Sequence, residues 1–153
     1  MATSGYTPRS SCGSKDMYSV EHHTGKLCEV RLATPISEAE LQSFVHDLTR
    51  VVGGISGKYV GVTDLMEAHL FPPNVTQMMI QYLSSSSPRV VRSGILIGEG
   101  ATFALQVERV LRSSNNDNRR AFRRVDELET WLGEVLSMDE RVRLRRFLSS
   151  RKM

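Results

Sequence analysis

Alternating polar and apolar residues near the start of the chain predict a β-hairpin. Two short stretches, 17–23 and 27–34, are separated by the turn-forming residues Thr24-Gly25-Lys26. In the second stretch one face is apolar, and the residues that share it are Cys28, Val30 and Leu32. Such alternation is typical of a strand that turns one face towards a core.

The rest of the chain alternates between short apolar runs and segments with helical spacing of apolar residues. Strands are predicted at residues 59–65, 90–98 and 119–125. Helices are predicted at residues 37–52, 73–83 and 101–112, with two more at 126–135 and 137–153. The serine-rich run 84–88 is expected to end the second helix.

Capping signals mark where several of these helices begin. Ser37 with Glu40, and Ser137 with Glu140, form S-x-x-E capping boxes. Asp126 is expected to cap the helix that follows the last strand. These signals place helix starts at three points that periodicity alone locates poorly.

The predicted order is ββαβαβαβα followed by a C-terminal helix. It indicates an α/β fold with a mixed sheet of about five strands, four helices and the terminal helix. Parallel pairs would be joined by right-handed crossovers, with an antiparallel strand at one edge. We divide the chain into a flexible arm at 1–16, an α/β domain at 17–136 and a basic helix at 137–153.

Composition is that of a globular protein, with 40% hydrophobic and 24% charged residues among 153. No apolar run is long enough to cross a bilayer, and the first residues lack the apolar stretch of a secretory signal. Cys12 and Cys28 form no C-x-x-C pair, so neither zinc binding nor dithiol redox chemistry is expected. A disulfide between them is not expected either, because no other feature suggests an oxidising location. These features favour a cytoplasmic location.

Positive charge is concentrated at the C-terminal end. The chain has a net charge of +3, and two acids accompany six basic residues after residue 138: Arg141, Arg143, Arg145, Arg146, Arg151 and Lys152. These are candidates for binding an anion, nucleic acid or an anionic surface. The apolar residues of this helix are expected to spread around it, which favours a solvated helix or a subunit contact: Val142, Leu144, Phe147 and Leu148.

No catalytic, cofactor or metal site is predicted. Asp64, Glu67 and His69 could together bind a divalent ion, but a solvated loop is the favoured interpretation. The run 98–100 (Gly-Glu-Gly) joins a strand to a helix, yet Phe103 replaces the third glycine of a dinucleotide fingerprint. We therefore expect a protein that is not an enzyme.

The order of elements and the segment 121–132 (AFRRVDELETWL) resemble the STAS-type fold. The resemblance is to its anti-sigma-factor-antagonist-like (SpoIIAA-like) bacterial group and spans residues 17–136. It implies a regulatory domain without catalysis that binds protein partners. In some members a serine or threonine after the third strand is phosphorylated.

The stretch that matches this phosphorylation region is 63–69, and it departs from the family pattern. It contains no serine and no Asp-Ser-Ser-Gly-like motif, and a double proline precedes the helix. Thr63 is its only hydroxyl, and Thr76 lies inside the following helix. The resemblance therefore implies only Thr63 and Thr76 as phosphorylation candidates.

The leading expectation is a regulatory or scaffolding domain that binds a protein partner, with a homo-oligomer as one form of that binding. The candidate partner surface consists of Asp64, Glu67, His69, Phe71, Met78 and Met79. One alternative is a carrier that holds a lipid or small apolar ligand between helix and sheet. The other is a nucleic-acid-associated protein that uses the basic C-terminal end.

Overall fold

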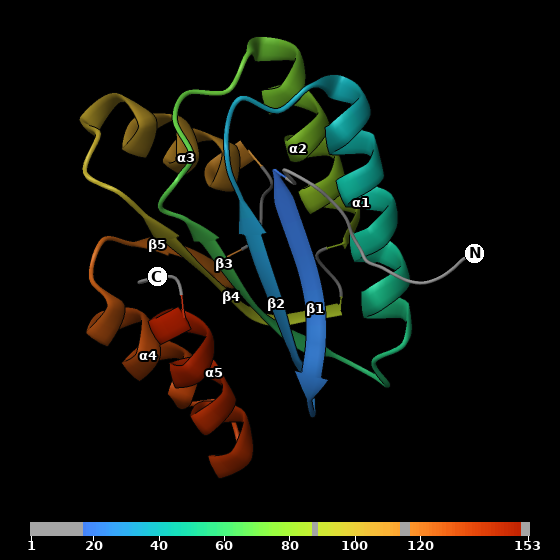
Figure 1. The fold of residues 1–153 in the computed structure, drawn as a ribbon, viewed down its shortest axis with the longest axis vertical. Helices are drawn as coiled ribbons and strands as arrows, with labels where there is room; N and C mark the ends of the chain where they lie inside the picture. Colours follow the sequence, from blue (N-terminus) through green and yellow to red (C-terminus); the bar gives the residue numbers. More distant parts are fainter. Residues whose placement is uncertain (1–16, 87–88, 114–116, 151–153) are drawn as a thin grey trace.

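The structure, a computed structural model, describes residues 17–86, 89–113 and 117–150 (Figure 1). In these ranges the strands are β1 (Tyr18–Thr24), β2 (Leu27–Leu32), β3 (Tyr59–Leu65), β4 (Val90–Ile97) and β5 (Arg119–Phe122). The predicted arm at 1–16, and with it Cys12, lies outside the described residues. So do Arg151 and Lys152.

The helices of the described ranges are α1 (Glu38–Gly53), α2 (Pro73–Ser86), α3 (Ala101–Ser113), α4 (Val125–Gly133) and α5 (Met138–Ser150). With the strands they confirm the predicted α/β class and the predicted order. None of the helices in the described ranges combines the length and apolar character that crossing a bilayer requires.

The sheet follows the chain order β1-β2-β3-β4-β5. β1 pairs antiparallel with β2, and every later pair is parallel. Successive right-handed crossovers that advance in one direction place their helices on the same face of a sheet. Accordingly α1, α2 and α3 cover one face, and α4 and α5 cover the other (Figure 1).

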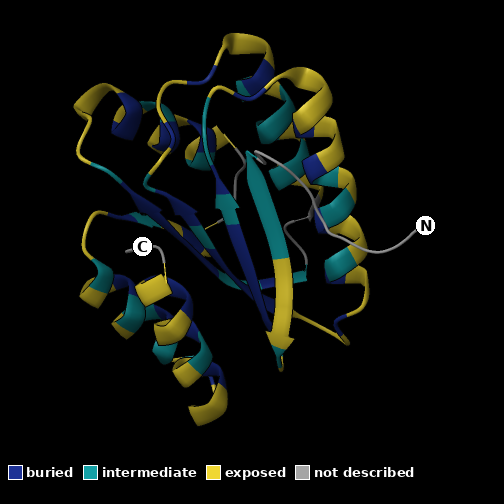
Figure 2. Cartoon of the chain, in the orientation of Figure 1, coloured by how far each residue is buried: buried dark blue, intermediate teal, exposed yellow. Residues whose placement is uncertain are grey.

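Each face of the sheet has its own core because side chains alternate along a strand. The first face, under α1 to α3, carries the predicted apolar residues of β2: Cys28, Val30 and Leu32. The second face packs against α4 and α5, and its fully buried residues include Leu27, Val60, Val62, Leu96, Leu128 and Leu132. Figure 2 shows the inner strands buried and the outer surfaces of the helices exposed.

Both predicted capping boxes are confirmed. Ser37 accepts a bond from the Glu40 N–H, and Glu40 accepts one from the Ser37 N–H. Ser137 and Glu140 repeat the arrangement at 3.2 and 2.8 Å. The prediction that Asp126 caps α4 is wrong, because the cap position is Arg124, whose side chain makes no capping bond.

Several boundaries differ from prediction, and β2, for example, ends at Leu32 where the strand was predicted to reach residue 34. The hairpin turn has two residues, Gly25 and Lys26, because Gly25 adopts a φ of 57° that allows a tight reversal. α2 continues through the serines, where Ser85 donates to the Tyr82 carbonyl at 2.9 Å. β5 ends at Phe122, where its pairing with β4 ends.

The interpretation of the terminal helix also needs correction. The apolar residues of α5 do not spread around the helix as expected, because Leu144, Phe147 and Leu148 are buried against the second face of its own sheet. Val142 alone of the four predicted apolar residues is on the outside, 59% exposed.

Candidate functional site

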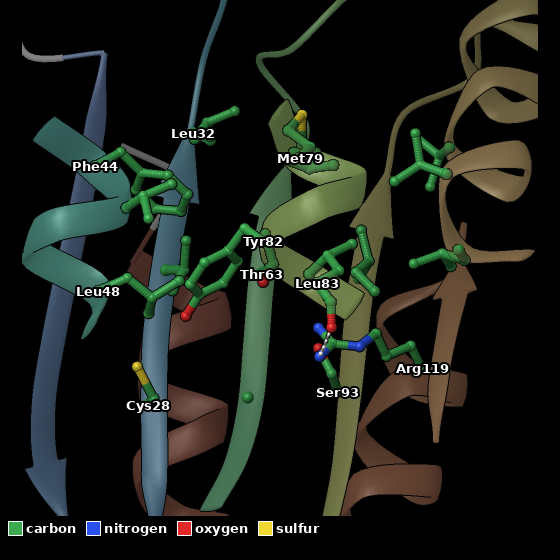
Figure 3. A pocket seen from close by; sticks show the side chains of 18 of the residues that line it. Cys28, Leu32, Phe44, Leu48, Thr63, Met79, Tyr82, Leu83, Ser93 and Arg119 are labelled. Atoms are coloured by element: carbon green, nitrogen blue, oxygen red, sulfur yellow. Dashed lines mark hydrogen bonds between the residues drawn. The ribbon is translucent and has the colours of Figure 1, made fainter. Parts of the chain in front are cut away.

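A cavity lies in the first face of the sheet, beneath α1, α2 and α3 (Figure 3). Its volume is about 110 Å³, and its walls come from aliphatic and aromatic side chains of the three helices, among them Leu41, Phe44, Leu48, Met79, Tyr82 and Val110. Thr63 lines it from the central strand and is still only half-buried. The cavity is not fully enclosed.

The floor of the cavity explains why there is a hollow. Cys28, Gly61, Ser93 and Arg119 occupy one register row across β2, β3, β4 and β5, and all four line the cavity. The middle of this row holds small side chains or none. A Cβ placed on Gly61 would meet Ser93 Oγ at 3.5 Å, which is ordinary contact, so space remains above it.

Arg119 closes one end of the row and brings a charge into an apolar site. It is 9% exposed, and its Nη2 donates to the Leu83 carbonyl near the end of α2 at 3.2 Å (Figure 3). Burial lowers the pKa of Arg119, and the phenol groups of Tyr59 and Tyr82 oppose that shift. A guanidinium remains protonated in proteins, so a buried cation borders the cavity.

Cys28 contributes a thiol to the opposite part of the floor. It is 1% exposed, and burial, with a smaller effect of the Glu29 carboxylate, raises its pKa to about 12. The reactive form of a cysteine is the thiolate. The Cys28 thiol therefore stays protonated and acts as an apolar part of the wall.

The arrangement suits binding better than catalysis. Of the described lining residues, Arg119 alone carries a charge. An apolar protein cavity of about 150 Å³ stays dry and binds benzene. A cavity of about 110 Å³ is therefore sized for a ligand near one small ring or short chain.

The predicted trio Asp64, Glu67 and His69 does not come together as a site. Asp64 is buried on the second face, where Arg31 Nε donates to it at 3.2 Å and the Met66 N–H at 2.9 Å. Glu67 and His69 are exposed in the loop after β3. Thr63 lies on the other face from Asp64, within the strand and towards the cavity.

The remaining predicted partner residues lie in the loop that precedes α2 and in α2 itself. Phe71 is buried, and its N–H and carbonyl are both bound by the Gln106 side chain at 2.9 Å. Gln106 also donates to Thr76 at 3.2 Å, so this phosphorylation candidate is already hydrogen-bonded. Met78 and Met79 pack against the first core, and Met79 lines the cavity.

The basic residues of α5 divide into two groups. Arg143 binds the buried Glu29 carboxylate with two bonds, Nε to Oε2 at 2.7 Å and Nη2 to Oε1 at 2.9 Å. Arg141, Arg145 and Arg146 are exposed on the outer side of the helix. The exposed group is the part of the predicted anion site that the structure leaves facing solvent.

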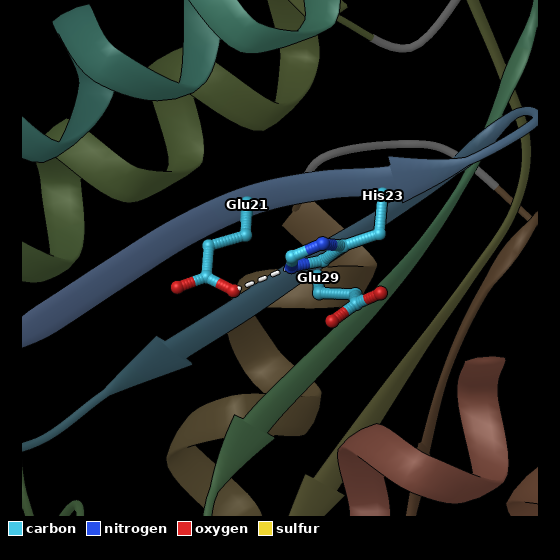
Figure 4. Close-up of side chains that lie close together, drawn as sticks. All are labelled: Glu21, His23 and Glu29. Carbon is cyan, nitrogen blue, oxygen red and sulfur yellow. Dashed lines mark hydrogen bonds and ion pairs between the residues drawn. The ribbon is translucent and has the colours of Figure 1, made fainter.

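A possible metal-ligand cluster that the sequence did not suggest lies at the sheet edge (Figure 4). Glu21, His23 and Glu29 have ligand atoms within 4.8 Å of one another. The antiparallel register sets Glu21 opposite Glu29, and this pairing is the signal that could have revealed it. Both oxygens of Glu29 are bound by Arg143, however, so its charge is already matched.

Comparison of the chain with models of protein families, with characterised proteins and with solved structures finds no match.

Proposed function

We propose that this protein is a binding domain without catalysis, and that it holds a small apolar ligand in the cavity under α1, α2 and α3. The cavity is the observation that carries the proposal: it is hollow, not fully enclosed and lined almost entirely by apolar side chains. Pockets of this composition, with a few polar groups that fix orientation, are the usual form of a small-molecule site.

The chemistry of the lining supports binding over reaction. Its thiol belongs to Cys28, whose pKa of about 12 removes it as a nucleophile at neutral pH. Its charged group is a guanidinium, which does not exchange protons near neutral pH. The resemblance to STAS-like regulatory domains stays part of this proposal, supported by the order of elements.

Ligand binding tests the proposal directly. Titration of the purified protein with benzene and with 1-hexanol, followed by heteronuclear NMR, should shift amide signals around Gly61, Thr63 and Ser93. Each ligand should also raise the melting temperature, because it binds the folded state alone. Binding confined to other surfaces, or absent, would refute the proposal.

A variant whose new side chain fills the cavity should lose ligand binding. Gly61→Val places a β-branched side chain in β3, which suits a strand. Its Cβ would meet neighbouring atoms only at ordinary van der Waals distances. We expect this variant to fold and to lose the benzene-induced shifts. Gly53→Ala is the control, because a Cβ there meets nothing within 4 Å and lies at the end of α1.

A protein partner is the second candidate function, and one surface feature favours it. Leu70 is 53% exposed and Leu105 is 68% exposed. They are the chain neighbours of Phe71 and Gln106, which hydrogen bonds hold together, so the two leucines lie in the same region. Exposed apolar patches mark contact sites.

Light scattering across a concentration series tests the homo-oligomeric form of this second candidate. A dimer that is lost in Leu105→Ser and kept in Val142→Ser would support it. A monomer at all concentrations would leave only a different protein as partner.

A further inference from the structure

We infer that the ligand of the cavity is a small apolar monocarboxylate whose acid group is recognised by Arg119. The inference rests on the proposed function, and it adds the chemical class of the ligand. Four observations carry it: the position of Arg119, the geometry of its side chain, the distribution of polarity in the cavity and the volume of the cavity.

The position of Arg119 makes an anionic ligand favourable. A cation that is 9% exposed at the edge of an apolar hollow has lost most of its hydration. The lowered pKa of Arg119 expresses the same loss. An anion in the cavity would restore part of the electrostatic stabilisation that water otherwise supplies, which a neutral ligand cannot do.

The side-chain geometry favours a carboxylate among anions. A guanidinium presents its N–H groups as a planar fork, which matches the two oxygens of a carboxylate. The single positive charge of Arg119 balances a monoanion, whereas a phosphate dianion would bring excess charge into an otherwise uncharged lining.

The charge of Arg119 lies at one end of the row, although the hydroxyls of Thr63 and Tyr82 also line the cavity. Ser93 is the register partner of Arg119 and lies beside it (Figure 3). On the other side of Gly61, the same row continues to Cys28, below Leu48 and Phe44. An acid group at the Ser93 and Arg119 end would therefore leave the apolar part of the ligand over Gly61.

The bond from Arg119 to Leu83 gives the residue a structural role as well. A cation near the C-terminal end of α2 is favourable because of the helix dipole. This role explains a positive charge at the helix end. It does not explain why the side chain also lines the hollow beside Ser93.

Volume limits the apolar part of the ligand. About 110 Å³ is less than the cavity of about 150 Å³ that accepts benzene. A short unbranched chain such as that of hexanoate is therefore a more suitable probe than benzoate, which is larger than benzene, and long-chain fatty acids are too large for the cavity.

The test compares three ligands of the same shape by isothermal titration calorimetry: hexanoate, 1-hexanol and hexylamine. We expect hexanoate to bind at least tenfold more tightly than 1-hexanol, and hexylamine to bind most weakly. Equal or tighter binding of 1-hexanol would overturn the inference and leave the proposed function intact. No binding of any of the three would overturn both.

Two variants of adjacent residues connect the preference to Arg119. Arg119→Gln should bind hexanoate no better than 1-hexanol, while its affinity for 1-hexanol stays within about twofold of wild type. Arg120→Gln is the matched control, because Arg120 is exposed and stands over Trp131 on the opposite face of β5. It should keep the full preference.

Retention of the hexanoate preference in Arg119→Gln would overturn the inference. If that variant does not fold, the pH dependence of the wild-type protein replaces it. Hexanoate affinity should then fall as the pH drops through the carboxyl pKa of the ligand, and 1-hexanol affinity should not. A hexanoate affinity that is independent of pH would also overturn it.

Discussion

Glu140 connects three parts of the molecule through one buried carboxylate. It is 5% exposed and accepts hydrogen bonds from the N–H groups of Ser137 and Lys26, each at 2.8 Å. The Lys26 ammonium adds an ion pair at 3.0 Å. A capping box at the start of α5 thereby also fixes the turn between β1 and β2. A Cβ on Gly25 would overlap this carboxylate, so glycine is required there for space as well as for its φ.

Truncating each capping-box glutamate to alanine should distinguish the contribution of the helix cap from the additional contribution of the Glu140 contacts with Lys26. Glu40→Ala removes a cap at an exposed helix start and should lower the free energy of unfolding by about 0.5–1 kcal/mol. Glu140→Ala also removes the acceptor of the part-buried Lys26 N–H, and should lower it by about 2–3 kcal/mol. Urea unfolding measures both. Equal losses would mean that Glu140 acts only as a cap.

Glu140 should also make stability depend on acid pH. Burial raises its pKa, but hydrogen bonds from Ser137 and Lys26 and the Lys26 charge outweigh burial and hold the pKa below its ordinary value of 4.5. A carboxyl with a depressed pKa stabilises the fold above its unfolded pKa and loses that contribution as the pH falls through the folded pKa. Between pH 6 and pH 3, wild type should therefore lose more unfolding free energy than Glu140→Gln. Parallel curves would contradict this assignment.

At the scale of elements, α5 shows why a residue's charge does not reveal its role. Arg143 is 20% exposed at its side chain and binds Glu29, which is 1% exposed. Arg145 lies on the outer side of the same helix, 78% exposed and 3.6 Å from Glu129. The sequence presents both as members of one basic cluster.

Removal of each arginine should therefore have very different effects on stability. Arg143→Met leaves the buried Glu29 carboxylate unpaired and should lower the unfolding free energy by about 3–5 kcal/mol. Arg145→Met breaks an exposed pair and should lower it by less than about 1 kcal/mol. Chemical denaturation of the two variants checks the difference. A small loss in Arg143→Met would show that Glu29 finds water or another partner.

Helices and strands were predicted correctly where a local sequence pattern determines them. They were predicted wrongly where packing or pairing with another element determines them. Alternation in β2 identified the face that carries Cys28, Val30 and Leu32. It did not reveal that Leu27, on the other face, is buried in a second core. The S-x-x-E boxes located two helix starts. The buried side of α5 was missed because Leu144 and Phe147 become internal only when the helix docks on the second face. The end of β5 likewise depends on β4.

At the scale of the whole molecule, the sheet separates a hollow core from a tight one. A Cβ on Gly61 would meet only ordinary van der Waals contacts on the first side, the nearest at 3.5 Å, whereas a Cβ on Gly94 would approach Leu132 at 3.1 Å and Leu128 at 3.2 Å on the second. The sequence shows both glycines inside strands. It could not show the hollow, because this requires the register that aligns Cys28, Gly61, Ser93 and Arg119 across four strands.

The same substitution at these two glycines should have opposite consequences for stability. Gly61→Ala reduces the backbone entropy of the unfolded chain without a clash and should raise the unfolding free energy by up to about 1 kcal/mol. Gly94→Ala forces two leucines of α4 outwards and should lower it by about 1–3 kcal/mol. Urea unfolding of both variants measures the contrast, and Gly53→Ala serves as a control outside the sheet. If Gly61→Ala destabilised the protein as much as Gly94→Ala, the first face would be as tightly packed as the second. The hollow that both proposals require would then be absent.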